Sequence, residues 1–488
     1  MSGKKYSDVV ITTTAPPAKE TVMAHKTYSV GTLIYTRSSL IAVLFWMLWA
    51  DFCLQIMEQV QTIIPLQLKW QGASDRIIGL FGGSLMAIVT VFLTPVIGMQ
   101  SDRHRGPLGR RRPFLLWLIP PVVISLILLG SSELIGGLIH TTMNFGLSQA
   151  QLTTLLIGIF TILFFIFNTY IMQIYQFLFV DVIPQEVMGK FIGLYRAVGA
   201  VSLFIFNRYL FGHAQTHTQK IYIGLAMLYS IAFVLLIWKV KEGEYPPPDA
   251  ETKNRKFINS LKIYFKECFS IPFYLKLYSI GLCFWAAIVP FITFIVFYAT
   301  DSNKTGYVQS LGISLDAFGK IKGWTCIIPV PFFLVIGPLI DRFHPLRVVI
   351  VGLFGICATF FLSFIFVKNE QTLLVFWLTN TAVTAVFLVG YLAMFARLLP
   401  QNKYGQFFSA NQLFFCAGLM FAPVLCGWLL EVVKNYRYIF LWSGFFALLG
   451  LCVAIAVFYH WRRLGGDKNY IPPELLHENS SAVSEMKA

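Results

Sequence analysis

The fold of this chain is decided by the stretch Gly98-Met-Gln-Ser-Asp102-Arg103-His-Arg105-Gly-Pro-Leu-Gly109-Arg110-Arg111-Arg112-Pro113. It places five arginines and one aspartate between two long apolar segments, in a chain of 488 residues of which only 12% are charged. Such a cluster is too costly to bury in the hydrocarbon of a bilayer. We therefore predict that it forms a short loop at a membrane surface.

The composition around this loop excludes a soluble protein. Hydrophobic residues make up 57% of the chain and aromatic residues 16%, far more than a soluble surface tolerates. Apolar runs recur, each long enough to cross a hydrocarbon core of about 30 Å at a helical rise of about 1.5 Å per residue. We predict an all-α polytopic membrane protein whose twelve spans lie near 38–60, 76–100, 113–131, 152–180, 191–211, 220–240, 276–299, 318–340, 346–367, 371–397, 406–430 and 437–461.

The distribution of charge predicts the orientation of these spans. The short connections on the face of the arginine stretch contain twelve lysines and arginines, and those on the other face contain six. Positive loops stay in the cytoplasm, so we expect this face and both termini there, in a plasma membrane or a bacterial inner membrane. The net charge of +15 then reflects contact with lipid headgroups and not with nucleic acid.

The longest polar connection divides the chain into two sets of six spans. We expect a cytoplasmic tail at 1–37, a six-helix bundle at 38–240, a cytoplasmic linker at 241–275, a second bundle at 276–461 and a tail at 462–488. From Phe257 to Cys268 the linker alternates apolar residues and lysines at helical spacing, which predicts an amphipathic helix on the inner leaflet.

The two halves repeat each other. Gly98-x-x-x-Asp102-Arg103 after the second span matches Gly337-x-x-x-Asp341-Arg342 after the eighth. After the fourth and tenth spans, a Pro-Gln pair is followed by Gly and Phe at an offset of 216 residues, at 184–191 and 400–407. Two matches in corresponding places indicate parallel repeats.

With these motifs the sequence resembles the major facilitator superfamily, whose loop between spans two and three reads Gly-x-x-x-Asp-Arg/Lys-x-Gly-Arg-Arg/Lys. This chain inserts residues 104–108 before Gly109-Arg110-Arg111-Arg112-Pro113. The longer form resembles the sucrose carriers and related glycoside-pentoside-hexuronide symporters. The resemblance implies two six-helix bundles that transport a small molecule by alternating access. We expect no enzymatic activity and no cofactor.

The cytoplasmic charges have two interpretations. They fix orientation, and they also suit a gate that joins the halves when the transporter is open to the outside, as the corresponding loop does in the resembled superfamily. In that gate Asp102 caps a helix of the other half, and the arginines reach Asp181 at the base of span four. We predict as gate residues Asp102, Arg103, Arg110, Arg111, Arg112, Asp181, Asp341, Arg342 and Arg397, the last being the repeat partner of Asp181.

Span one carries a polar stripe. Asp51, Gln55 and Glu58 are spaced by four and three residues and share one helical face. Asp51 lies about 20 Å from the start of the span, near mid-membrane, where a charge costs at least about 2.5 kcal/mol unless it faces water. Asp51 is our candidate for proton coupling, with Glu58 second. The alternative is a hydrogen-bonded structural acid.

Amides, hydroxyls and aromatic rings on several spans suit a sugar, because hydroxyls take hydrogen bonds and ring faces stack on C–H surfaces. Hydrogen bonds between helices are the alternative explanation. The candidate substrate-binding residues are Trp49, Gln55, Asn168, Thr169, Gln173, Gln176, Arg196, Trp285, Asn380, Thr384, Tyr391, Asn411 and Gln412.

The sequence therefore favours proton-coupled uptake of a sugar or glycoside, and export of amphiphilic compounds is the alternative. Sodium is disfavoured, because sodium-using members of the resembled symporters carry paired aspartates on span two, and residues 77–100 contain no acid. A receptor or membrane enzyme is disfavoured because the chain has no catalytic cluster and no large soluble domain. No Cys/His spacing indicates a metal site.

Overall fold

A computed structural model describes residues 27–143, 146–244, 264–300, 310–331, 343–400, 403–470 and 472–473. Eleven helical segments within these residues are long and apolar enough to cross a membrane. The all-α polytopic fold is confirmed. The predicted eighth span lies partly outside the described residues.

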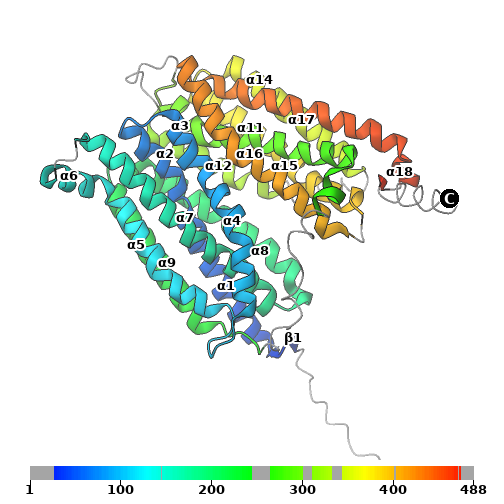
Figure 1. Ribbon diagram of the computed structural model, residues 1–488, viewed down its shortest axis with the longest axis horizontal. Helices are drawn as coiled ribbons and strands as arrows, with labels where there is room; N and C mark the ends of the chain where they lie inside the picture. The colour runs from blue at the N-terminus through cyan, green and yellow to red at the C-terminus, as the bar shows by residue number, and fades with distance from the viewer. Residues whose placement is uncertain are drawn as a thin grey trace, which may run out of the picture.

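The first half begins with a short hairpin and continues as helices (Figure 1). Its elements are β1 (Tyr28–Val30), β2 (Leu33–Tyr35), α1 (Arg37–Glu58), α2 (Val60–Trp70), α3 (Asp75–Gly79), the π-helical turn η1 (Leu80–Ser84), α4 (Leu85–Arg103), α5 (Arg112–Gly130), α6 (Ser132–Thr142), α7 (Gln149–Val182), α8 (Gln185–Ile205), η2 (Phe206–Leu210), η3 (Phe211–His213) and α9 (Thr218–Lys239).

The second half comprises α11 (Pro272–Thr300), α12 (Leu315–Ile327), α14 (Pro345–Phe366), α15 (Glu370–Leu398), α16 (Tyr404–Val433), α17 (Tyr438–Arg463) and the short α18 (Gly466–Asn469). Most of these helices end within a few residues of the predicted spans. Of the predicted amphipathic helix, only residues 264–268 are described, and they lie in a helical turn at 264–269.

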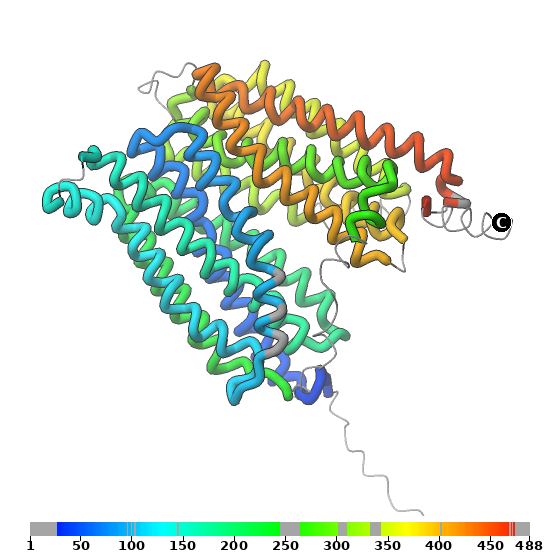
Figure 2. Tube along the Cα trace, viewed as in Figure 1, coloured from blue at the N-terminus to red at the C-terminus, as the bar shows by residue number. Residues whose placement is uncertain are grey.

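Three elements differ from the sequence prediction. The first span continues through α2 to Trp70, so most of the predicted loop at 61–75 is helical. The predicted loop at 132–150 contains α6, which projects sideways from the first bundle, in cyan in Figure 2. The hairpin of β1 and β2 precedes the first span. Its three-residue strands are too short to give a clear alternating pattern.

The two halves pack as separate bundles that meet at one end. In the first half α5 packs against α7 and α9, and α1 against α8 and α9. In the second, α11 packs against α16 and α17, and α14 against α15 and α17. We call the face where α1 begins and α17 ends the tail face, and the opposite face the far face. The bundles diverge toward the tail face and converge toward the far face (Figure 1).

Glycines allow the halves to approach closely near the far face. A Cβ on Gly79 would lie 2.3 Å from the backbone oxygen of Pro423, and one on Gly427 would lie 2.3 Å from that of Asp75. The main chains of α3 and α16 are therefore in direct contact. Next to this crossing, α12 packs against α8, η2 and η3.

Polar contacts reinforce this closure. The Arg76 backbone N–H and guanidinium donate to Glu431, at 2.9 and 2.6 Å. The Tyr436 hydroxyl donates to Asp75 at 2.8 Å, and Lys69 lies 3.5 Å from the same carboxylate. Asp75 is buried, so these partners compensate for the removal of its charge from water.

Candidate functional site

A cavity of about 330 Å³ lies between the two halves, below the contacts that close the far face. Its walls come from α2, η1, α4, α7 and η3 of the first half and from α11, α12 and α16 of the second. The lining residues are Gln61, Thr62, Pro65, Phe81, Gly82, Gly83, Met86, Ala87, Thr90, Phe165, Phe211, Val289, Ile292, Thr293, Val296, Phe318, Lys322, Phe415, Cys416 and Leu419.

The cavity is mainly apolar and contains one charged side chain. Lys322 on α12 is the only charged residue in its described lining, and its ammonium group lies 5.0 Å from the centre of the Phe211 ring. Lys322 is not among the residues predicted from the sequence. The signal was present, because a lysine five residues into the predicted eighth span is costly in hydrocarbon unless it serves a cavity or a partner.

None of the substrate-binding residues predicted from the sequence is among the described residues that line this cavity. Trp49 is partly exposed and stacks on Phe52, with ring centres 5.8 Å apart. Gln173 is half-buried. Gln176 and Gln412 are exposed. Thr169 is buried. These five side chains remain candidates by sequence only.

The polar stripe of span one faces the interior of the first bundle. Asp51 is fully buried and accepts a hydrogen bond from Gln55 at 3.4 Å, while its Oδ2 atom has no partner among the described residues. Arg196 on α8 is exposed, and its guanidinium lies 5.9 Å from the centre of the Tyr195 ring. About two turns along α1 from Asp51, Glu58 accepts a hydrogen bond from Asn168 of α7 at 3.4 Å. The stripe of α1 thus holds two acids inside the first bundle, each in contact with one amide.

Three of the predicted residues in the second half form hydrogen bonds between helices. Asn380 donates to Thr359 of α14 at 2.8 Å. Tyr391 donates to Asn411 at 3.0 Å and joins α15 to α16. These bonds fit the alternative interpretation of structural contacts between helices. Trp285 packs edge-on against the cavity residue Phe415, with ring centres 4.9 Å apart. Thr384 has a buried hydroxyl without a partner in the described part of the chain.

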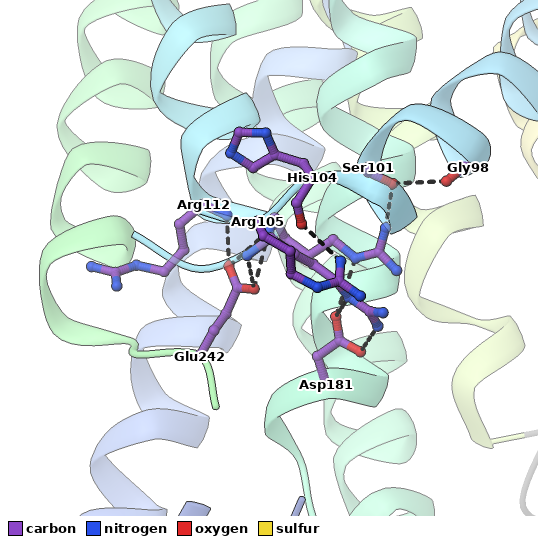
Figure 3. Close-up of polar contacts among 9 residues, drawn as sticks. Gly98, Ser101, His104, Arg105, Arg112, Asp181 and Glu242 are labelled. Atoms are coloured by element: carbon purple, nitrogen blue, oxygen red, sulfur yellow. Dashed lines mark hydrogen bonds and ion pairs between the residues drawn. The ribbon is translucent and has the colours of Figure 1, made fainter. Parts of the chain in front are cut away.

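The arginine stretch folds around two carboxylates at the tail face (Figure 3). Arg110 donates to Asp181 at 2.6 and 3.3 Å, and Arg111 donates to it at 3.1 Å. The side chain of Arg111 is only 6% exposed and that of Asp181 only 7%. Arg112 was expected at the same acid, but its guanidinium donates to the backbone oxygen of Ile237. This cluster lies within the first half.

The second carboxylate is that of Glu242, which lies in the predicted linker. It accepts the backbone N–H groups of Arg110, Arg111 and Arg112 at 2.8, 3.0 and 2.6 Å. These three N–H groups lie at the start of α5, where no carbonyl of the helix can accept from them. The negative charge of Glu242 at this N-terminus also interacts favourably with the helix dipole. Gly109 adopts a φ of +94°, and a Cβ there would lie 2.8 Å from Glu242.

We expect Glu242→Gln to lower the stability of the folded protein by about 1–2 kcal/mol, the range for losing a charged helix cap. Glutamine keeps one acceptor oxygen but loses the charge and the second acceptor. Thermal unfolding of the purified protein measures the change. Glu244→Gln is the control, because Glu244 is exposed two residues further on. Equal unfolding temperatures for the two variants would contradict this role.

Other predicted gate residues are only partly described. The backbone of Asp102 and Arg103 ends α4, but their side chains lie outside the described set, as do Asp341 and Arg342. Arg397 is exposed at the end of α15. Burial first, and then the charge of Arg397, lowers the pKa of His344 to about 4. The neutral ring accepts the backbone N–H of Leu346 at 3.3 Å and caps α14.

The second half of the chain matches a known family by sequence. Residues 292–478 match the sequence profile described as Major Facilitator Superfamily. No curated protein sequence matches the chain significantly. The nucleoside transporter NupG, in a structure of a point mutant, superposes with a TM-score of 0.65 at 12% identity, covering 86% of this chain and 100% of its own.

The chain has the major facilitator fold. A bacterial homologue of the iron transporter ferroportin in its inward-facing state superposes with a TM-score of 0.64 at 13% identity, covering 86% of this chain and 99% of its own. A D-xylose-proton symporter gives 0.58 at 14% identity, covering 89% and 97%. The cavity of this chain lies between the two bundles of that fold.

Proposed function

We propose that this protein is a secondary active transporter that moves a small organic solute across a membrane by alternating access. The observation that carries the proposal is the placement of the cavity between halves that meet at the far face and diverge toward the tail face. Rocking one bundle against the other would close the tail face and expose the same cavity to the far side.

We propose that the tail face is cytoplasmic and that the membrane is a plasma membrane or a bacterial inner membrane. The twofold excess of lysine and arginine in the loops of this face supports that orientation. The two states of the bacterial ferroportin homologue also support it, because the chain superposes with a TM-score of 0.64 on the inward-facing state and 0.52 on the outward-facing state.

The first candidate activity is proton-coupled uptake of a sugar or glycoside. It is supported by the polar stripe of α1, in which Asp51 and Glu58 each meet an amide. The resemblance of the arginine stretch to the sucrose carriers and glycoside-pentoside-hexuronide symporters points to the same class of solute. In this scheme protons are the coupling ion, and the protein uses no cofactor.

The second candidate activity is export of an amphiphilic compound. The apolar cavity favours it, because a sugar needs many hydrogen-bonding groups around its ring. Apart from Cys416, the polar uncharged side chains of the described lining are one glutamine and three threonines. The hydroxyl groups of the threonines, Thr62, Thr90 and Thr293, donate to backbone carbonyls three or four residues earlier. These hydroxyls are not available as donors to a sugar.

Reconstitution into liposomes containing a pH-sensitive dye tests both activities. Sugar uptake with protons predicts acidification of the lumen when a mono- or disaccharide is added. Amphiphile transport predicts saturable exchange of an amphipathic solute without a sugar-dependent pH change. Absence of saturable exchange of any solute by folded protein would refute the transporter proposal.

Asp51→Asn separates coupling from solute binding. We expect this variant to lose at least tenfold of its uphill, proton-driven uptake while retaining exchange of labelled for unlabelled solute, because the neutral amide cannot bind and release a proton. Parallel uptake and exchange assays on one liposome preparation measure the ratio. Normal uphill uptake by Asp51→Asn would leave Asp51 as a structural acid.

A further inference from the structure

Lys322 places a cation in the central cavity, and the described residues include no acidic partner for it. Lys322 is half-buried, and its ammonium lies over the Phe211 ring. Within the described part of the chain, no carboxylate lies within ion-pair distance of it. Asp316, six residues earlier on the same helix, pairs instead with Lys320 at 2.5 Å. A charge in such surroundings usually has a counter-ion.

The other hydrogen-bonding groups of the cavity also favour a solute that accepts hydrogen bonds. Because the hydroxyl hydrogens of its three threonines are used within their own helices, Lys322 and the Gln61 amide are the strong donors left in the described lining. Two donors of this kind suit a solute that presents acceptor oxygens, and one of them carries a positive charge.

The rest of the cavity suits an apolar body. Phe81 and Phe165 of the first half and Phe318 and Phe415 of the second contribute aromatic rings to the walls. A volume of about 330 Å³ accommodates one or two fused rings with a short polar head. Lys322 lies on α12 and Gln61 on α2, so a solute that contacts both touches both halves.

We propose that the central cavity binds amphipathic organic monoanions and that Lys322 binds their carboxylate. This inference rests on the proposed transport function, because it names the solute class of the same site. Gln61 supplies a second donor to the head group, and the phenylalanines enclose the ring. A bound anion would also neutralise the lysine while the site is closed to water, where an unpaired charge is costly.

A matched pair of probes tests the inference. Naphthalene-2-carboxylate and naphthalene-2-carboxamide have nearly the same shape and differ in charge. With purified full-length protein in detergent, we expect titration calorimetry to show the carboxylate binding at least tenfold more tightly, the scale of a charge-assisted hydrogen bond in a cavity. Equal affinities for the two probes would overturn the inference.

Variants on α12 then assign the effect to one side chain. We expect Lys322→Met to abolish the advantage of the carboxylate over the amide, while Lys322→Arg keeps this advantage. Lys320→Met is the matched control, because Lys320 is on the same helix and is paired with Asp316. Retention of the full advantage by Lys322→Met would overturn the inference.

A second measurement on the wild-type protein does not require the variant to fold. An amine-reactive reagent is allowed to modify the protein, and mass spectrometry reports the yield at Lys322. We expect the carboxylate, but not the amide, to protect Lys322, with Lys320 unprotected by either probe. Equal modification of Lys322 with and without carboxylate would overturn the proposed contact.

These experiments test the anion site and the transport function independently of each other. Carboxylate binding as expected, with no exchange of any solute by liposomes, would refute transport and support the anion site. Saturable exchange of neutral solutes, with no preference for the carboxylate, would refute the anion site and support transport. Exchange of the carboxylate that is lost in Lys322→Met and kept in Lys320→Met would support both.

Discussion

Replacing Asp181 by asparagine is expected to lower the stability of the folded protein by about 3 kcal/mol. Asp181 balances two guanidinium groups, with contacts of 2.6 Å to Arg110 and 3.1 Å to Arg111. The side chain of Arg111 is 6% exposed, so water does not solvate its charge once the carboxylate is gone. Loss of a buried carboxylate that accepts charge-assisted hydrogen bonds from two guanidinium groups accounts for the size of the effect.

The control is an ion pair of similar length that water can reach. Asp467 pairs with Arg347 at 2.5 Å, but the two side chains are 49% and 40% exposed. Asp467→Asn should therefore change stability by less than about 1 kcal/mol. Thermal unfolding of both purified variants gives the comparison. Similar unfolding temperatures for the two variants would show that burial of the Asp181 cluster contributes nothing.

The same variant tests the proposed gate. If the cluster also helps to close the tail face, Asp181→Asn should reduce transport per folded molecule more than it reduces the amount of folded protein. Uptake normalised to folded protein in liposomes measures this. Unchanged normalised uptake would leave the arginine stretch with its structural and topological roles alone.

The sequence predicts those features that depend on local pattern. The apolar period gives the spans; the predicted span 346–367 is α14, Pro345–Phe366. The sequence also predicts the contact of Arg110 and Arg111 with Asp181. These residues lie at the ends of spans on the same face, and opposite charges at a membrane surface tend to form ion pairs. Whether this contact acts as a gate stays a prediction.

Features that depend on long-range packing were missed. Glu242 is 130 residues from Arg112, and nothing in its neighbourhood distinguishes a helix cap from the start of a polar linker. The cavity draws its lining from eight elements in two halves, so helical spacing on one span cannot reveal it. The polar stripe of α1 could be predicted from the spacing of its residues. Lys322 is the one charged residue of α12 in the described cavity lining, so no spacing pattern indicates it.

The close contact of the halves near the far face also could not be predicted from sequence periodicity. The pattern Gly79-Leu-Phe-Gly82-Gly83 shows small residues, but not what they face. In the structure, a Cβ on Gly82 would meet Pro65 at 2.5 Å, and one on Gly83 would meet Pro423 at 2.7 Å. The π-helical turn at 80–84 presents these glycines to two different helices, and such turns are frequent at functional sites.

Gly427→Ala is expected to shift the protein away from the state closed at the far face. The added Cβ would lie 2.3 Å from the backbone oxygen of Asp75, and a main-chain atom cannot rotate aside as a side chain does. Relieving the overlap requires α16 and α3 to separate, at a cost of about 2 kcal/mol for overpacking. That cost amounts to about a 30-fold shift in the equilibrium between the two states.

Hydrogen–deuterium exchange measures this shift without labels. In Gly427→Ala we expect faster exchange in α3 and in the last turns of α16, and slower exchange at the tail face in residues 104–112, as that face closes. Gly224→Ala on α9 is the control, because a Cβ there meets nothing within 4 Å. Faster exchange across the whole of α16, with no protection at the tail face, would mean local unfolding. Reciprocal changes at the two faces are what rigid-body alternation requires, since one rocking motion must open one face as it closes the other.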